Sequence, residues 1–305
     1  MKKTFLFLSL AGLIFSANAQ DISEKNIKNH IQTLADDKML GRGTSEQGEK
    51  LAADYISKEF KKIGLKPAGD SAYIAPFKFT FKKYKENNPH AELESSEERI
   101  GWNVVGYLDN GAPYTIIIGA HYDHLGTGEL GSSLDPEPKG KIHNGADDNA
   151  SGVAGVIELA RYFTSNKIKE NCNFLFLCFS GEELGLYGSK SFAENSSFDP
   201  KKIQLMINMD MIGRLDSKEK KLMVYGIGTS PSLPELVNNF KPADFNLVLD
   251  SSGMGPSDHT SFYLKDIPVL AFFTGQHSEY HKPEDDADKI NFKGEKEILV
   301  YVAQI

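Results

Sequence analysis

The sequence has 305 residues, of which 40% are apolar, 25% charged and 10% aromatic. This composition excludes collagen-like, coiled-coil and intrinsically disordered chains, and the length suffices for one large domain or two small ones. With 34 Lys and Arg against 42 Asp and Glu, the formal charge is −8, which is opposite in sign to that of most nucleic-acid-binding proteins, so we expect no nucleic-acid partner.

The first 19 residues have the pattern of a secretory signal peptide. Lys2 and Lys3 give a basic start, residues 5–15 form an apolar run, and residues 17–19 are a small-residue cleavage signal. The apolar run is too short for a comfortable membrane span. We therefore expect cleavage near Ala19, no stable membrane anchor, and a mature chain that is secreted or periplasmic.

The chain that follows alternates between helical and strand patterns. Residues 24–36 and 46–63 have helical periodicity, and residues 153–160 indicate a third helix. Apolar runs predict strands over 76–81, 102–108, 114–120, 173–179, 203–210, 221–226 and 267–273. The polar stretch 84–99 is expected to be a loop or an excursion at the sheet edge, and the Gly-, Ser- and Pro-rich stretch 125–146 is expected to be a second long loop. A further helix is expected over the last twelve residues.

The strand patterns also indicate the fold class. Runs such as 173–179 are continuously apolar, as strands are when both faces of their sheet are covered. Strand, helix and strand in alternation predict an α/β protein with a largely parallel sheet.

Polar residues that can bind metal follow most of the predicted strands. They are His121 and Asp123, Asp147 and Asp148, Glu182 and Glu183, Asp210, and His281. A single Asp after a strand is usually a turn residue, but so many metal-binding types at one place are hard to explain as turns. Because ligands bind at the carboxyl ends of strands in open α/β sheets, we expect these side chains to share one site.

The charges of these residues indicate the metal content. Asp148, Glu183 and Asp210 would repel each other in one pocket unless cations lie between them. Three carboxylates and one hydroxide balance two divalent cations, and two histidines complete a ligand set suited to zinc. Ions about 3.5–4 Å apart need a bridging ligand. Asp148, at the start of a helix, is our choice for the bridge.

Two residue pairs suggest further roles. His121 and Asp123 are two apart on an extended segment, so their side chains point the same way and Asp123 can orient the imidazole. In the pair Glu182-Glu183, one carboxylate can bind metal while the other transfers protons. The residues alone leave open which glutamate has which role.

Six segments together resemble a known family. They are AHYDHLG (120–126), NGADDNASG (144–152), SGEELGLYGS (180–189), NMDMIGR (208–214), SDHTSFYLKDIPV (257–269) and EYHKPEDDADKI (279–290). In this order they resemble the zinc-dependent exopeptidases typified by bacterial leucyl aminopeptidases, whose superfamily also contains glutamate carboxypeptidases, glutaminyl cyclases and transferrin receptors. The segment LGRGTSEQGEKLAADYISKEFKKIGLKPAG (40–69) is similar to the N-terminal helical part of secreted bacterial members.

The resemblance implies two Zn²⁺ per chain and eight site residues. These are the zinc ligands His121, Asp148, Glu183, Asp210 and His281, and the catalytic residues Glu182, Asp123 and Tyr280. Asp148 would bridge the ions, before a cis peptide bond to Asn149. Glu182 would be the general acid and base, Asp123 would stand behind His121, and Tyr280 would help polarise the scissile carbonyl.

The resemblance also implies an architecture. It is a three-layer α/β sandwich, with a mixed, mostly parallel, twisted sheet of about eight strands and helices on both faces. Residues 20–305 would form a single catalytic domain, because the stretch near 84–100 is too short for the protease-associated insert of larger relatives.

The predicted function is a secreted di-zinc aminopeptidase. It would use metal-activated water and a Glu general base to hydrolyse N-terminal residues from peptides with a free N-terminus. A glutaminyl cyclase, which uses one zinc, and a carboxypeptidase or dipeptidase on the same scaffold are the nearest alternatives. A non-catalytic binding module would have lost ligands, and none is missing here. Four further histidines are available, namely His124, His143, His259 and His277. His124 and His143 lie beside the matched motifs and are candidates to line the site, whereas His259 is the strongest competitor of His281.

Overall fold

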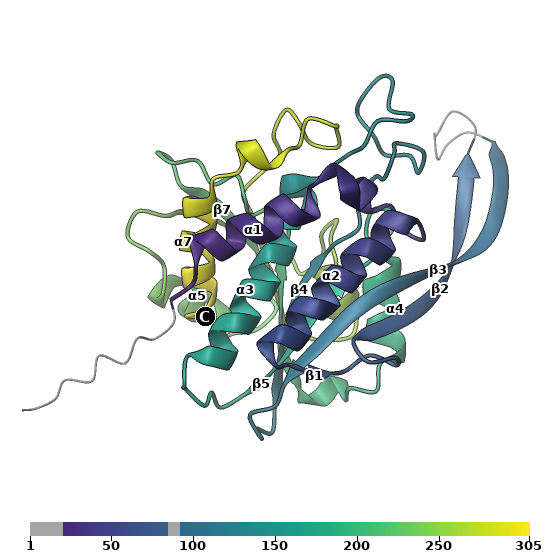
Figure 1. Ribbon diagram of the computed structural model, residues 1–305. Coiled ribbons are helices and arrows are strands. Elements are labelled where there is room, and N and C mark those ends of the chain that lie inside the picture. Colours follow the sequence, from purple (N-terminus) through teal and green to yellow (C-terminus); the bar gives the residue numbers. More distant parts are fainter. Residues whose placement is uncertain (1–20, 85–91) are drawn as a thin grey trace, which may run out of the picture.

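The structure is a computed structural model that describes residues 21–84 and 92–305 (Figure 1). The predicted signal peptide and its cleavage site therefore lie outside the described residues. Within the described ranges, none of the helices combines the length and the apolar character that crossing a membrane requires.

Nine strands of the described chain form one open, mixed sheet. They are β1 (Lys66–Pro67), β2 (Ile74–Tyr84), β3 (Leu93–Leu108), β4 (Thr115–His121), β5 (Asn173–Phe179), β6 (Ile203–Met209), β7 (Lys221–Tyr225), β8 (Asn246–Leu249) and β9 (Val269–Phe273). Their order is β1-β3-β5-β4-β6-β9-β7-β8, and β2 pairs with β3. The central strands β5, β4, β6 and β9 are parallel, whereas β3 and β7 join this centre antiparallel.

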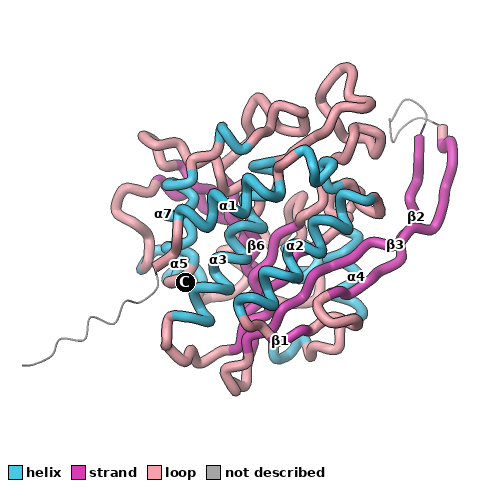
Figure 2. Tube along the Cα trace, viewed as in Figure 1, coloured by secondary structure: helices cyan, strands magenta, loops and turns pink. Residues whose placement is uncertain are grey.

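Helices cover both faces of the sheet. They are α1 (Glu24–Leu34), α2 (Gln47–Ile63), α3 (Gly152–Ser165), α4 (Tyr187–Asn195), α5 (Leu233–Asn239), α6 (His259–Tyr263) and α7 (Phe292–Val302). Figure 2 shows α1, α2, α3 and α7 together in front of the strands. The helices α4 and α6 contact each other and the sheet, and they contribute to a separate apolar core.

The pattern of β5 explains this three-layer arrangement. Every residue of the strand is buried, and successive side chains point to opposite faces. Phe176 and Cys178 belong to the core beneath α1, α2, α3 and α7, whereas Leu177 and Phe179 belong to the core that contains Phe192 of α4. Truncating a Phe buried in this way to Ala typically costs about 3–5 kcal/mol of stability. The continuous apolar run thus encodes a central strand with two covered faces.

The predicted fold class is confirmed, with differences in detail. The sheet has nine strands rather than about eight, because β1 and β2 both lie along β3. Of the two expectations for 84–99, an edge excursion is confirmed from Leu93 onward, where β3 begins, and a loop is wrong there. There β2 and β3 form a two-stranded ribbon whose far ends project from the body of the molecule (Figure 1). Residues 93–98 are exposed on both faces, so their polar sequence resembles that of a loop.

Parallel strand ends define the place of the site. His121 is the last residue of β4, Asp210 follows β6 directly, and the Glu182-Glu183 pair follows β5 after a short turn. Because β5, β4 and β6 are adjacent and parallel, their carboxyl ends lie at one edge of the sheet. The expected gathering of polar side chains at this edge follows from the strand order.

Candidate metal centre

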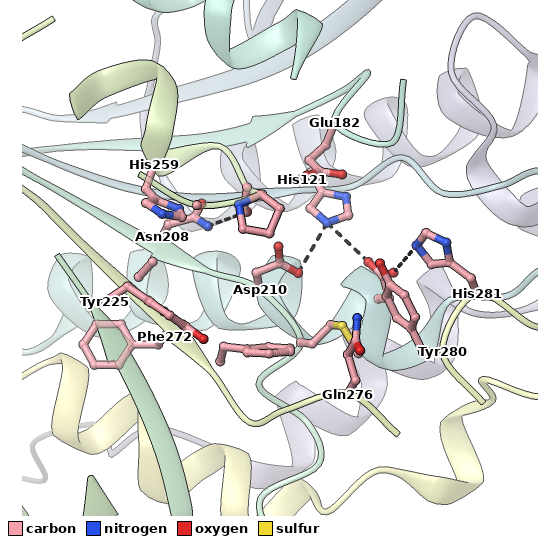
Figure 3. Close-up of a pocket in the computed structure, with 17 residues that line it drawn as sticks. His121, Glu182, Asn208, Asp210, Tyr225, His259, Phe272, Gln276, Tyr280 and His281 are labelled. Carbon is pink, nitrogen blue, oxygen red and sulfur yellow. Dashed lines mark hydrogen bonds and ion pairs between the residues drawn. The ribbon is translucent and has the colours of Figure 1, made fainter. Parts of the chain in front are cut away.

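One group of metal-binding atoms forms around His121. Its Nε2 lies 3.3 Å from Asp148 Oδ1 and 3.5 Å from Asp210 Oδ1. In Figure 3, Asp210 and His121 both line the cavity and point toward each other, and a dashed line marks the ion pair between them. His121 and Asp148 are almost fully buried, so few water molecules can solvate this group.

A second group forms around His281, which comes from the loop after β9. Its Nε2 lies 3.2 Å from Asp148 Oδ2 and 3.2 Å from Glu183 Oε2. Asp148 therefore offers one carboxylate oxygen to each histidine. This is the arrangement expected of a carboxylate that bridges two cations.

The spacing of these atoms fits zinc. Ligand atoms about 2 Å from a tetrahedral zinc ion lie about 3.3 Å from one another. The four distances within the two groups are 3.2, 3.2, 3.3 and 3.5 Å. The donors are imidazole nitrogens and carboxylate oxygens, which zinc accepts readily. The structure thus brings together all five predicted ligands in an arrangement that zinc can occupy.

The segment that presents Asp148 is held by neighbouring loops. Asp285 Oδ2 accepts hydrogen bonds from the backbone N–H groups of both Asp147 and Asp148, at 2.9 and 3.0 Å. The Asn149 side chain bonds to the backbone at the end of β6. The peptide bond between Asp148 and Asn149 is cis, as the family resemblance implies. Burial raises the pKa of Asp148, but the hydrogen bonds from His121 and His281 together with the charges of His124 and His121 hold this pKa well below its ordinary value.

His124 is a further member of the site. Its ring is fully buried, and its Nδ1 lies 2.7 Å from Glu183 Oε1 but 3.9 Å from Asp148 Oδ2. The short distance is that of a hydrogen bond, so His124 holds the Glu183 oxygen that does not face His281. Sequence analysis placed His124 beside a matched motif as a candidate to line the site, but not as a partner of Glu183. Its position three residues after His121 was the available signal.

Asp123 lies behind His121 as expected, but its carboxylate bonds mainly to other groups. Asp123 Oδ1 is 3.7 Å from His121 Nδ1, whereas the Asp123 backbone carbonyl is 3.1 Å from the same nitrogen. The carboxylate accepts hydrogen bonds from the Glu182 N–H at 3.2 Å and from Thr44 Oγ1 at 2.8 Å. Asp123 therefore links the end of β4 to the turn after β5.

Glu182 and Tyr280 line the cavity next to the two groups (Figure 3). Burial raises the pKa of Glu182 well above its ordinary value. The charge of His121 opposes this rise, and the charge of Glu183 adds to it. The Glu182 side chain is nevertheless partly exposed, on the side of the cavity. The ring of Tyr280 stacks on that of His281, with centroids 3.9 Å apart. Both residues thus lie on the cavity wall beside the two groups of metal-binding atoms.

The cavity has a volume of about 170 Å³. Apart from the predicted site residues, its wall is mainly apolar and aromatic and includes Met211, Tyr225, Pro256, Ala271, Phe272 and Phe273. His259, the competitor of His281, also lines it, but both of its ring nitrogens lack a hydrogen-bond partner among the described residues. His259 therefore belongs to the pocket wall rather than to either group of metal-binding atoms.

The other two candidate histidines lie in supporting networks. His143 bonds through its ring nitrogens to Ser133 Oγ and to the Lys141 carbonyl. His277 lies between Asp147 and Glu279, with contacts of 3.3 and 3.1 Å, and Glu279 pairs with Arg214. Sequence reasoning missed this network, because the spacing of its members along the chain follows no metal-binding or catalytic pattern.

Comparisons with known proteins agree with this geometry. A family model described as "Peptidase family M28" matches residues 103–305. "Leupeptin-inactivating enzyme 1" of Streptomyces exfoliatus is 26% identical over 275 residues, covering 88% of this chain and 53% of that protein. A "Probable leucine aminopeptidase" of Trichophyton verrucosum (strain HKI 0517) is 26% identical over 257 residues, covering 81% and 60%. The chain thus spans just over half the length of these curated relatives.

Solved structures share the fold. "Aminopeptidase from Aneurinibacillus sp. strain AM-1" superposes with a TM-score of 0.70 at 19% identity, covering 94% of this chain and 93% of that one. A leucine aminopeptidase precursor from Bacteroides thetaiotaomicron VPI-5482 superposes with a TM-score of 0.72 at 17% identity, covering 94% and 98%. At these identities the superpositions support the architecture alone.

Proposed function

The chain belongs to peptidase family M28, and from this membership we propose that it is a secreted di-zinc aminopeptidase that removes N-terminal residues from peptides. One observation carries the proposal. The two oxygens of Asp148 face two separate groups of metal-binding atoms, one completed by His121 and Asp210 and the other by Glu183 and His281.

The residues divide the chemistry between metal and protein. Zinc bound by the five ligands would acidify a water molecule and polarise the scissile carbonyl. Glu182, on the cavity wall and outside both groups, would take the proton of the attacking water and return it to the leaving amine. The Tyr280 hydroxyl is a hydrogen-bond donor at neutral pH and lies on the same wall, where it would stabilise the developing oxyanion.

The cavity favours an exopeptidase. Its volume of about 170 Å³ has room for one side chain, and it is smaller than the roughly 300–1,000 Å³ of pockets that take drug-sized ligands. The free α-amine of a peptide's first residue would lie near one of the zinc ions, beside the polar groups that line the cavity. A substrate would therefore place its N-terminal residue in the cavity and its first peptide bond at the metals.

The alternatives make different demands on the site. A glutaminyl cyclase needs one zinc, so it has no use for a carboxylate that faces two ligand groups. A binding module needs neither the bridge nor a proton-transferring Glu182. A carboxypeptidase or dipeptidase would use the same ligands, and substrate assays must separate it from an aminopeptidase. We further propose that residues 20–305 act as a single catalytic domain without an insert.

The test is a combined zinc and substrate measurement on the purified mature protein. We expect two zinc ions per chain and rapid cleavage of at least one aminoacyl-anilide from a panel with Leu, Ala, Met, Lys and Gln. The matched N-acetyl-aminoacyl-anilide should be inert, and chelation followed by zinc addition should abolish and restore activity. Undiminished activity after full demetallation, or equal cleavage of the blocked substrate, would contradict the proposal.

A further inference from the structure

We propose that the segment 40–49 is a positioning element of the metal centre, acting through Arg42, Thr44 and Glu49. The segment lies outside residues 103–305, which the family model matches, and contains no proposed zinc ligand. The inference rests on the proposed function, because it assigns these side chains the task of setting the geometry of the zinc ligands.

Arg42 ties together the two loops that carry ligands of the first group. Its Nε donates to the Tyr122 carbonyl at 2.6 Å, between His121 and Asp123. Its Nη1 and Nη2 donate to the carbonyls of Asn144 and Gly145, at 2.6 and 2.9 Å, in the turn that leads to Asp148. A fourth bond, from Nη1 to the Leu34 carbonyl, anchors the guanidinium to the end of α1.

The environment of Arg42 shows that it does more than fill space. The side chain is fully buried, and its four hydrogen bonds described above all go to backbone carbonyls. Burying a guanidinium without a carboxylate directly against it is costly. The charges of Asp148 and Asp123 offset part of that cost. A buried cation is thus kept immediately behind the acidic metal site.

Thr44 connects the segment to Asp123. Its hydroxyl donates to Asp123 Oδ2 at 2.8 Å, and both residues are fully buried. The same carboxylate accepts the backbone N–H groups of Glu182 at 3.2 Å and Glu183 at 3.4 Å. The Thr44 hydroxyl therefore fixes the carboxylate that holds the turn carrying the proposed general base and one zinc ligand.

Glu49, in the first turn of α2, reaches the same turn from another side. Its Oε1 accepts from the Ser180 hydroxyl and, at 3.0 Å, from the Trp102 N–H. Its Oε2 accepts from the Ser45 N–H at 2.6 Å, which also fixes the segment itself. Ser180 lies directly after β5 and two residues before Glu182. Glu49 therefore fixes the start of the turn that carries Glu182 and Glu183.

The backbone of the segment is shaped for this close approach. Leu40, Gly41 and Arg42 all have left-handed conformations, with φ of 52°, 66° and 51°. A Cβ added at Gly41 would lie 2.3 Å from the Gly126 carbonyl oxygen. Backbone hydrogen bonds join the segment to 124–126, from His124 N to Arg42 O and from Gly126 N to Gly41 O. Residues other than glycine keep such conformations only where the surroundings enforce them.

These contacts predict an effect on zinc affinity that packing alone would not give. The ligand loops leave different strands, and the segment 40–49 contacts the end of β4, the turn before Asp148 and the turn after β5. Groups that orient metal ligands from behind typically contribute 10–100-fold to metal affinity. We therefore expect loss of these bonds to weaken zinc binding by about 10–100-fold.

The variants are chosen to change one contact each. Thr44→Val removes the hydroxyl at nearly constant volume, and Thr44→Ser restores it. Arg42→Lys keeps the buried charge but cannot bond to four carbonyls. Glu49→Gln replaces one carboxylate oxygen by an amide N–H group, which cannot accept the hydrogen bonds that Glu49 receives at that position. Ile56→Val is the control, because Ile56 is fully buried on α2 but belongs to the apolar core.

The readout is zinc affinity by chelator competition on the demetallated protein, beside kcat and KM. We expect Thr44→Val, Arg42→Lys and Glu49→Gln to lose 10–100-fold in zinc affinity and to lose kcat more than they change KM. Thr44→Ser and Ile56→Val should stay within about threefold of wild type, with circular dichroism confirming that each variant is folded.

Two outcomes overturn the inference. One is wild-type zinc affinity in folded Thr44→Val and Arg42→Lys. The other is a loss in Ile56→Val as large as in Thr44→Val at matched thermal stability. If a variant does not fold, the Thr44→Val and Thr44→Ser pair decides. A wild-type chain that binds no zinc overturns the proposed function as well, whereas equal loading of wild type and variants overturns this inference alone.

Discussion

Glu182 and Glu183 are adjacent in sequence but occupy different surroundings. Glu183 Oε2 faces His281 and Glu183 Oε1 faces His124, so both of its oxygens have imidazole partners. Glu182 instead lines the cavity and lies outside the two ligand groups. Successive residues of this turn thus lie in different parts of one site, as the proposed division into a metal-binding and a proton-transferring glutamate requires.

This difference predicts separable effects of two conservative substitutions. Glu182→Gln should retain two zinc ions per chain but lose about 10²–10⁴-fold in kcat, because an amide cannot accept the proton of water. Glu183→Gln should lose the zinc ion that Glu183 is proposed to bind, because a charged ligand becomes neutral. Metal analysis and steady-state kinetics on both variants check the prediction. Loss of zinc from Glu182→Gln, or its full activity, would reverse the assignment of the pair.

The two histidines next to Glu183 also predict distinct behaviour. His281 lies 3.2 Å from both Asp148 and Glu183, whereas His124 lies within hydrogen-bonding distance of Glu183 alone. We therefore expect His281→Ala to bind one zinc ion per chain. His124→Ala should still bind two, at least tenfold more weakly, as is typical when a group behind a ligand is lost.

Metal analysis after dialysis against buffered zinc separates the two cases. His259→Ala is the matched control, because His259 lines the cavity without a hydrogen-bond partner in the described chain. It should keep both ions at unchanged affinity. Two ions in His281→Ala together with one in His124→Ala would show that the two histidines exchange roles.

At the scale of elements, the buried or half-buried apolar strands could be predicted, including the short β7 and β9, whereas exposed strands and the shortest helices could not. Strands β5 and β6 match their apolar runs closely, since burial on both faces leaves little freedom of composition. The first half of β3 is exposed on both faces, so its sequence carries no strand signal. The helix α6 has five residues, too few for a helical period to appear.

The contact between α1 and α2 includes a histidine whose protonation affects stability. His30 of α1 is buried, and its Nδ1 lies 2.7 Å from the Tyr55 hydroxyl of α2. Burial lowers the pKa of His30 below 6.5, against the pull of Glu59 and Glu158 and with the help of Lys62 and Arg161. The folded protein therefore holds this imidazole neutral under conditions in which the unfolded chain protonates it.

The sign of the resulting pH dependence follows from linkage. Below pH 6.5 the unfolded chain binds a proton at His30 that the folded chain does not, so acidification favours unfolding. We expect the free energy of unfolding to fall from pH 7 to pH 5 more steeply in wild type than in His30→Gln, which does not titrate. Urea titrations of the zinc-loaded proteins at both pH values measure the difference. Equal slopes would exclude His30 as a contributor.

At the scale of the molecule, the site is assembled from parts that lie far apart along the chain. Its proposed ligands extend from His121 to His281, and the parallel strands β4, β5 and β6 bring most of them to one edge of the sheet. Sequence predicted His121, Glu183 and Asp210 because they closely follow apolar strands. It predicted Asp148 because this residue opens a helix after a long loop, and His281 because it lies beyond the last apolar run. It did not predict the roles of Arg42 and Glu49, which act across 80 or more positions through contacts that no local pattern encodes.

The concentration of carboxylates predicts how the whole molecule responds to metal removal. Asp148, Glu183 and Asp210 are held close together in a buried pocket, so without cations their repulsion opposes folding. Zinc that binds the folded chain alone stabilises it by RT ln(1 + [Zn²⁺]/Kd), which is about 4 kcal/mol at a thousandfold excess over Kd. We expect chelation to lower the melting temperature by several degrees and zinc to restore it.

Two comparisons distinguish this effect from general ionic stabilisation. Sodium chloride should not restore the melting temperature of the chelated protein, because salt screens buried charges weakly. His281→Ala should show a smaller zinc-dependent shift than wild type, since it retains one proposed ion site, formed by His121, Asp148 and Asp210. A melting temperature that is unchanged by complete demetallation would mean that these carboxylates do not depend on a cation, and the charge balance underlying the di-zinc proposal would fail.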